Sequence, residues 1–178
     1  MKKIKTLLLA LPFVLFSCSS DDGPGAEAIP EFAMTASING SEFKANTPFG
    51  NNMFSNTNVF NVFPIEEYVL LQGRSGGVFG NPEINLWLKR SQIAVGTYPV
   101  SEDMFNPTTH TIDLIDNSND EGEDTVEGTV VITEVNTSTK IVKGTFEFTT
   151  SDSPDLPSPV INYTITNGKF RYQYEAVD

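Results

Sequence analysis

Short runs in which every second residue is apolar recur along this sequence, and they restrict the fold to β-sheet. Residues 32–38 alternate in this way and are followed by Asn39-Gly40, the dipeptide most typical of a two-residue hairpin turn. After residue 31 no stretch shows the period of an amphipathic helix, so a parallel sheet with crossover helices is excluded. The sequence therefore predicts an all-β fold, an antiparallel β-sandwich of about nine strands, with a closed lipocalin-like barrel as the alternative.

The same alternation, together with the turns between the runs, indicates the other strands. They are expected at 41–46, 67–74, 83–89, 96–100, 109–115, 127–135, 140–150, 160–166 and 169–175. The last two would form a hairpin through a second Asn-Gly pair, Asn167-Gly168. Residues 46–61, rich in asparagine and phenylalanine, are expected to form a long loop.

The N-terminal segment has the features of a secretory signal peptide. Three lysines precede ten apolar residues at 7–16, a run too short to span a bilayer as a helix. Residues 15–18, Leu-Phe-Ser-Cys, resemble the lipobox of bacterial lipoproteins, although Phe16 stands where a small residue is usual. The resemblance implies that Cys18, the one cysteine of the chain, is acylated, for example with palmitate. The alternative is an ordinary signal peptide followed by a free thiol.

These features predict three parts: a lipoprotein signal peptide at 1–17, a disordered tether at 18–31 and a single β domain at 32–178. Ser19-Ser20-Asp21-Asp22 resembles the surface-export signal of Bacteroidota lipoproteins, which implies an outer-membrane protein that faces the cell surface. The alternative is a plain solvated tether.

The charge of the chain excludes some partners. The net charge is −12, and removal of the three lysines at 1–17 makes it −15. Phosphate binding needs a basic face, so no nucleic-acid partner is expected, and docking on anionic lipid heads is disfavoured for the same reason. We therefore expect the protein to associate with the membrane through the lipid anchor on Cys18.

An acidic segment at 116–127 is the candidate metal site. Starting from Asp116, oxygen-bearing side chains fall at the ligand positions of a calcium-binding loop: Asp116, Ser118, Asp120, Asp124 and Glu127. However, Glu121 stands where such a loop needs glycine, and no helices flank the segment. The alternative is a solvated acidic turn between strands, without a cofactor.

Aromatic residues give the candidate ligand site. Trp87 lies on the polar side of its predicted strand, and Phe54 and Phe60 lie in the 46–61 loop, so the three could form a platform for sugar stacking. The alternative is that Trp87 packs inside a barrel or under a loop. His110 is the one histidine and has no nucleophile motif to serve, so no catalytic residue is assigned.

One further motif concerns modification. Asp124-Thr125-Val126 resembles the O-glycosylation sequon of Bacteroidota, which implies a glycan on Thr125.

Three stretches resemble a family of uncharacterised β-rich lipoproteins of Bacteroidota: residues 36–43, Gly144 to Phe148 and Ile165 to Phe170, together with Gly96-Thr97-Tyr98. That family has no settled activity, so the resemblance assigns no functional residue. Because the sequence shows no catalytic constellation, we expect a non-enzymatic binding or interaction module for a glycan or protein ligand. The alternative is a hydrolase that uses two carboxylates on extracellular glycans.

Overall fold

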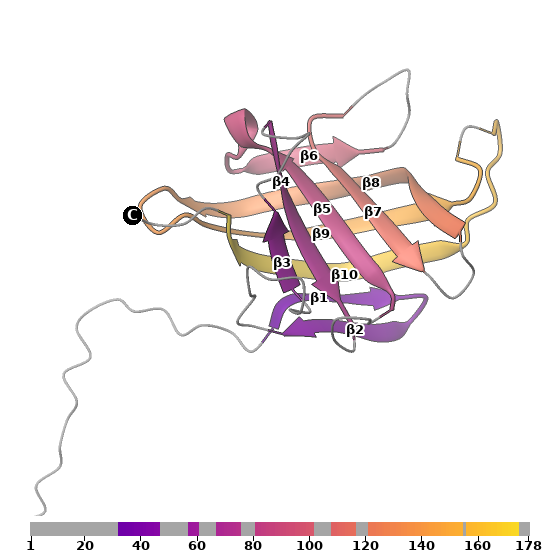
Figure 1. Ribbon diagram of the computed structural model, residues 1–178. Helices are drawn as coiled ribbons and strands as arrows, with labels where there is room; N and C mark the ends of the chain where they lie inside the picture. Colours follow the sequence, from indigo (N-terminus) through magenta and orange to yellow (C-terminus); the bar gives the residue numbers. More distant parts are fainter. Residues whose placement is uncertain are drawn as a thin grey trace, which may run out of the picture.

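The computed structural model describes residues 32–46, 57–60, 67–75, 81–101, 108–116, 121–154 and 156–174, and it is almost entirely β (Figure 1). Its strands are β1 (Phe32–Ile38), β2 (Ser41–Asn46), β3 (Thr57–Phe60), β4 (Tyr68–Arg74), β5 (Glu83–Lys89), β6 (Gly96–Val100), β7 (Thr111–Asp116), β8 (Glu121–Asn136), β9 (Ile141–Ser151) and β10 (Tyr163–Gln173). A single short 3-10 helix, η1 (Arg90–Gln92), interrupts them within the described ranges. The predicted all-β class is confirmed.

The strands form one antiparallel sheet that curls into a half-barrel. Their order is β2-β1-β10-β9-β8-β7-β5-β4-β3, and β6 pairs with β8 beside this path. In Figure 1 the strands β3, β4, β5 and β7 cross in front of the others. We call these four the front layer, and the remaining six strands the back layer. The order ends at β2 and β3, and the choice between a sandwich and a closed barrel stays a prediction.

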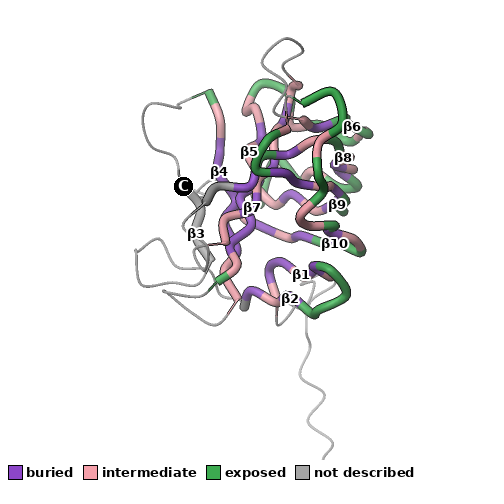
Figure 2. The backbone as a smooth tube through the Cα atoms, turned by 90° about the vertical axis from the view of Figure 1, so that its right-hand side faces the viewer, coloured by how far each residue is buried: buried purple, intermediate pink, exposed green. Residues whose placement is uncertain are grey.

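The core lies between the layers, and Figure 2 marks buried residues on strands of both. Leu71, Leu86 and Leu114 of the front layer are fully buried against a cluster that includes Ile132 and Ile165 of the back layer. Tyr172 of β10 is buried with them, and its hydroxyl donates a hydrogen bond of 2.9 Å to the backbone carbonyl of Gln72 in β4. Burial raises the pKa of this phenol well above its usual value.

The two Asn-Gly pairs adopt different structures. Asn39 and Gly40 have φ of 48° and 84° and form the predicted hairpin turn between β1 and β2. At the second pair only Asn167 has a positive φ, of 54°, and both residues lie inside the continuous strand β10. The predicted hairpin of 160–166 and 169–175 is therefore wrong. Asn167-Gly168 forms a bulge that adds one residue to β10 relative to both β1 and β9.

Two predicted loops are also shorter than expected. Residues 57–60, placed in the 46–61 loop, form β3 and pair with β4. Residues 121–126, expected to lie outside the strands 109–115 and 127–135, belong to β8. In both cases pairing with a neighbouring strand overrides the composition of the segment.

Glycines opposite phenylalanines allow β8, β9 and β10 to pack closely. Gly128 pairs with Phe148, and Gly168 pairs with Phe146. Gly144 pairs with Phe170, whose ring occupies the space that a side chain at 144 would need. A Cβ added at Gly144 would lie 2.6 Å from Cζ of Phe170 and would clash with the carbonyl oxygen of Val131. The stretches Gly144 to Phe148 and Ile165 to Phe170 thus carry a packing role.

We expect Gly144→Ala to lower the free energy of unfolding by about 3 kcal/mol, because neither the Val131 backbone nor the buried Phe170 ring can move away freely. Urea unfolding monitored by circular dichroism measures the change. The matched control is Thr145→Ala on the exposed face, with an expected loss of about 1 kcal/mol or less. Equal stability of the two variants would contradict the packing role.

Candidate functional site

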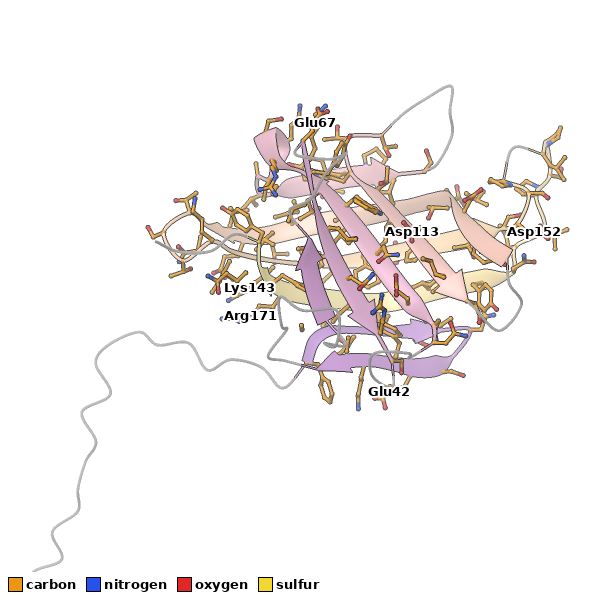
Figure 3. The ribbon with its side chains drawn as sticks, viewed as in Figure 1. Glu42, Glu67, Asp113, Lys143, Asp152 and Arg171 are labelled. Atoms are coloured by element: carbon orange, nitrogen blue, oxygen red, sulfur yellow. The ribbon has the colours of Figure 1, made fainter. Side chains whose placement is uncertain are left out.

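A cluster of polar side chains lies on the side of the front layer that faces away from the core. It comprises Gln72, Arg74, Glu83, Asn85, Trp87 and Asp113, and we call it the outer-face network. Figure 3 shows Asp113 on this outward side. Although Gln72, Glu83 and Asn85 point away from the core, they are only 5%, 7% and 4% exposed. Burying these polar side chains without hydrogen-bond partners would cost free energy. Their hydrogen bonds therefore determine what the cluster can do.

Strand alternation and register bring these residues together. Even-numbered residues of β4 and odd-numbered residues of β5 and β7 point to the outer face, since Val69, Leu71, Ile84 and Leu86 occupy the core. Gln72 lies opposite Asn85, which lies opposite Asp113 on the next strand. The three side chains therefore form one row across three strands.

The row is joined by hydrogen bonds that run toward Asp113. Nε2 of Gln72 donates to Oδ1 of Asn85 at 3.1 Å and to Oε1 of Glu83 at 2.7 Å. Nδ2 of Asn85 donates to Oδ1 of Asp113 at 2.9 Å. Arg74 donates to Oε2 of Glu83 and forms an ion pair with it. The network thus holds two carboxylates and one guanidinium.

Trp87 is attached to the same carboxylate. Its indole Nε1 donates to Oδ2 of Asp113 at 2.9 Å, and its side chain remains partly exposed. This bond fixes the direction of the ring, while the exposed part stays available to a ligand. The register also places Phe60 of β3 opposite Leu70, and Leu70 opposite Trp87. Two of the three predicted aromatic residues therefore share one row, and Phe54 lies outside the described residues.

The electrostatics of Asp113 reflect its surroundings. Burial raises the pKa of this carboxyl, and the negative charge of Glu83 acts in the same direction. The hydrogen bonds from Asn85 and Trp87 oppose that shift because they stabilise the ionised form. All four carboxylate oxygens of Asp113 and Glu83 accept a hydrogen bond from within the network. This arrangement suits positioning of Trp87 better than proton transfer to a substrate.

The sequence did not single out Gln72, Arg74, Glu83, Asn85 or Asp113. A weak signal was present, since polar residues occupy alternate positions of 72–74, 83–87 and 111–113. Only the strand register shows that these positions lie in neighbouring rows.

The structure describes three of the five predicted calcium ligands, and these lie on two different strands. Asp124 and Glu127 lie in the extended strand β8, and Asp116 ends β7, where Oδ2 accepts a 2.6 Å hydrogen bond from the hydroxyl of Tyr163. That bond raises the pKa of Tyr163 to about 12. Ser118 and Asp120 fall outside the described residues. Across the part of the chain that the structure describes, no group of three or more metal-ligating side chains is found.

Thr125 points into the protein. It is 1% exposed, and its hydroxyl donates to the backbone carbonyl of Ile112. This burial counts against a glycan on Thr125 in the folded domain.

His110 directly precedes β7 and is fully buried next to Lys89, the last residue of β5. Its Nδ1 accepts a hydrogen bond of 3.1 Å from the backbone N–H of Lys89, and its ring meets that of Tyr98 edge-on at 4.4 Å between centroids. Burial lowers the pKa of the imidazole from 6.5 to about 4. Because protonation would place a proton on the acceptor atom, the neutral form is the one that this contact requires.

We expect His110 to make the domain less stable in acid. Above pH 6.5 the imidazole is neutral in both states, whereas between pH 6.5 and about 4 only the unfolded chain binds the proton. The free energy of unfolding should therefore fall by up to about 3 kcal/mol over that interval. The control is His110→Asn, whose amide oxygen can accept from Lys89 without titrating. Urea unfolding of both proteins across this pH range should show an additional loss in the native protein, and parallel curves would refute the assignment.

Comparison with known proteins identifies the domain without naming an activity. Residues 42–172 match the model of a domain of unknown function, DUF6252. The chain belongs to this family. The DUF6252 match covers the outer-face network and the Gly-Phe pairs, but only the last two residues of the 36–43 stretch. No curated protein and no solved structure matches the chain. Among the described residues no helix is long and apolar enough to cross a membrane.

Proposed function

We propose that this DUF6252 protein is a lipid-anchored protein of the bacterial outer membrane that faces the cell surface, and that its β domain is a non-enzymatic module that binds a polysaccharide. The lipobox-like residues 15–18 support the anchor, and the residues Ser19-Ser20-Asp21-Asp22 support the location at the cell surface. An acyl group on Cys18 would supply the membrane affinity that the net charge of the chain does not favour.

The partly exposed Trp87, held by Asp113 on the outer face, carries the binding proposal. Sugar rings present C–H faces that stack on an aromatic ring, and a ring whose direction is already fixed loses little freedom when it binds. The strongly acidic chain favours a neutral polysaccharide over an anionic one. Phe60 is in the same row of the sheet, with Leu70 between it and Trp87, and is the residue that we propose for a second sugar contact.

A carboxylate hydrolase is the second candidate, because burial raises the pKa of Asp113 as a general acid requires. Against it, both Asp113 and Glu83 already accept hydrogen bonds at both oxygens. We therefore place Asp113 as a positioning residue for Trp87.

The anchor is tested by changing Cys18. We expect Cys18→Ala to abolish incorporation of a fatty-acid label and to move the protein from the membrane fraction to the soluble fraction, because no other residue can take the thioether-linked lipid. Ser19→Ala, the matched control, should stay labelled and membrane-bound. A Cys18→Ala protein that remains in the membrane fraction would contradict the proposal, and protease added to intact cells would test the surface location.

The binding site is tested by affinity gel electrophoresis with soluble glucans, mannans and xylans. We expect at least one of these to retard the native protein and Trp87→Ala to weaken binding by about tenfold, the effect of losing one stacked ring. Trp87→Phe keeps a ring but not the N–H donor and should bind with intermediate strength. Thr145→Ala, on the outer face of the other layer, should bind like the native protein.

Two outcomes would overturn this proposal. If none of the polysaccharides retards the native protein, or if Trp87→Ala binds as well as the native protein does, Trp87 is not a sugar platform. If new reducing ends appear and Asp113→Asn abolishes them, the domain is the hydrolase.

A further inference from the structure

The two Asn-Gly pairs also differ in how tightly each asparagine side chain is held. Asparagine followed by glycine can deamidate without a catalyst, because glycine has no side chain to shield its backbone nitrogen. That nitrogen gives up its proton to solvent and attacks the asparagine Cγ. The C–N bond of the side-chain amide then breaks, and its nitrogen takes up a proton and leaves as ammonia. Water then opens the cyclic imide to aspartate or isoaspartate. The reaction requires that the asparagine side chain be free to turn toward the following nitrogen.

Asn39 does not have that freedom. Its Nδ2 donates to the backbone carbonyl of Asn162 at 3.0 Å, and its Oδ1 accepts from the backbone N–H of Thr164 at 2.8 Å. The backbone N–H of Asn39 also donates to the carbonyl of Thr164 at 3.0 Å. Both polar atoms of the side chain are therefore bound to a neighbouring segment.

Asn167 is held much less. It is exposed, and the hydrogen bond that its side chain makes among the described residues is a long one, 3.5 Å from Nδ2 to Oγ1 of Thr166. It is also skipped by the pairing of β10 with both β1 and β9, because the extra residue of the bulge falls here. A local opening at this position therefore breaks no strand pairing of Asn167 itself, and the pairing that it must release is that of Gly168, whose nitrogen is the attacking group, with Phe146 of β9.

We propose that Asn167 is a site of spontaneous deamidation and that Asn39 is protected from it by the fold. The product places a new carboxylate on the outer face of the back layer. Asn167 and Lys169 line a shallow hollow of about 350 Å³ there, together with Thr129, Thr145 and Glu147. Deamidation would add one negative charge to this surface and, as isoaspartate, one backbone carbon to β10 at its bulge.

The test is peptide mapping by mass spectrometry of the full chain after incubation in mildly alkaline buffer. In the folded protein we expect the Asn167 peptide to deamidate at least about tenfold faster than the Asn39 peptide, since two hydrogen bonds must break to release Asn39. In denaturant both pairs lose their structural context, and the two rates should become similar. Asn167→Gly accepts the positive φ and removes the reactive group, so it should abolish the fast change.

Deamidation of Asn39 before Asn167 in the folded chain would show that the hydrogen bonds give no protection. An unchanged Asn167 in the folded chain, under conditions where the denatured chain reacts at both sites, would show that the bulge holds it as firmly as the turn holds Asn39.

Discussion

The fold depends on one long strand of the back layer, β8, that also pairs with the front layer. The first residues of β8 pair with β7 in the front layer, and the rest pair with β9 and β6 in the back layer. Register shifts at 125–127 and 132–134 give this strand the irregularities that allow an antiparallel strand to bend. Because β7, β5 and β4 follow β8 in the order of the sheet, the position of the outer-face network is set by where β8 passes from one layer to the other.

Much of this architecture could be predicted from alternation alone. Residues 32–38, 83–89 and 140–150 have one apolar face each, and each forms a strand at nearly the expected bounds. The error at the second Asn-Gly pair occurred because that local signal has two structural meanings. Asn-Gly tolerates positive φ in a hairpin turn and in a bulge alike, and the sequence around Asn167 does not show that the chain continues straight.

The candidate site was only partly predictable, for a different reason. Trp87 stood out because a large aromatic residue on a polar face is unusual. Asp113 did not, because one aspartate among many acidic residues carries no distinguishing signal. Its importance comes from lying opposite Asn85 and beside the indole N–H, and these are facts of strand register that no local pattern encodes.

Gln72 connects the interior of the protein to this surface. Its side-chain amide donates to Glu83 and Asn85 on the outer face, while its backbone carbonyl accepts from the buried Tyr172 of the opposite layer. The same residue is therefore bonded on both sides of the sheet. A ligand that restrained the outer-face network would restrain β4 against β10 as well. Resistance of the whole domain to heat would then report occupancy of a site at its surface, without any label on the ligand.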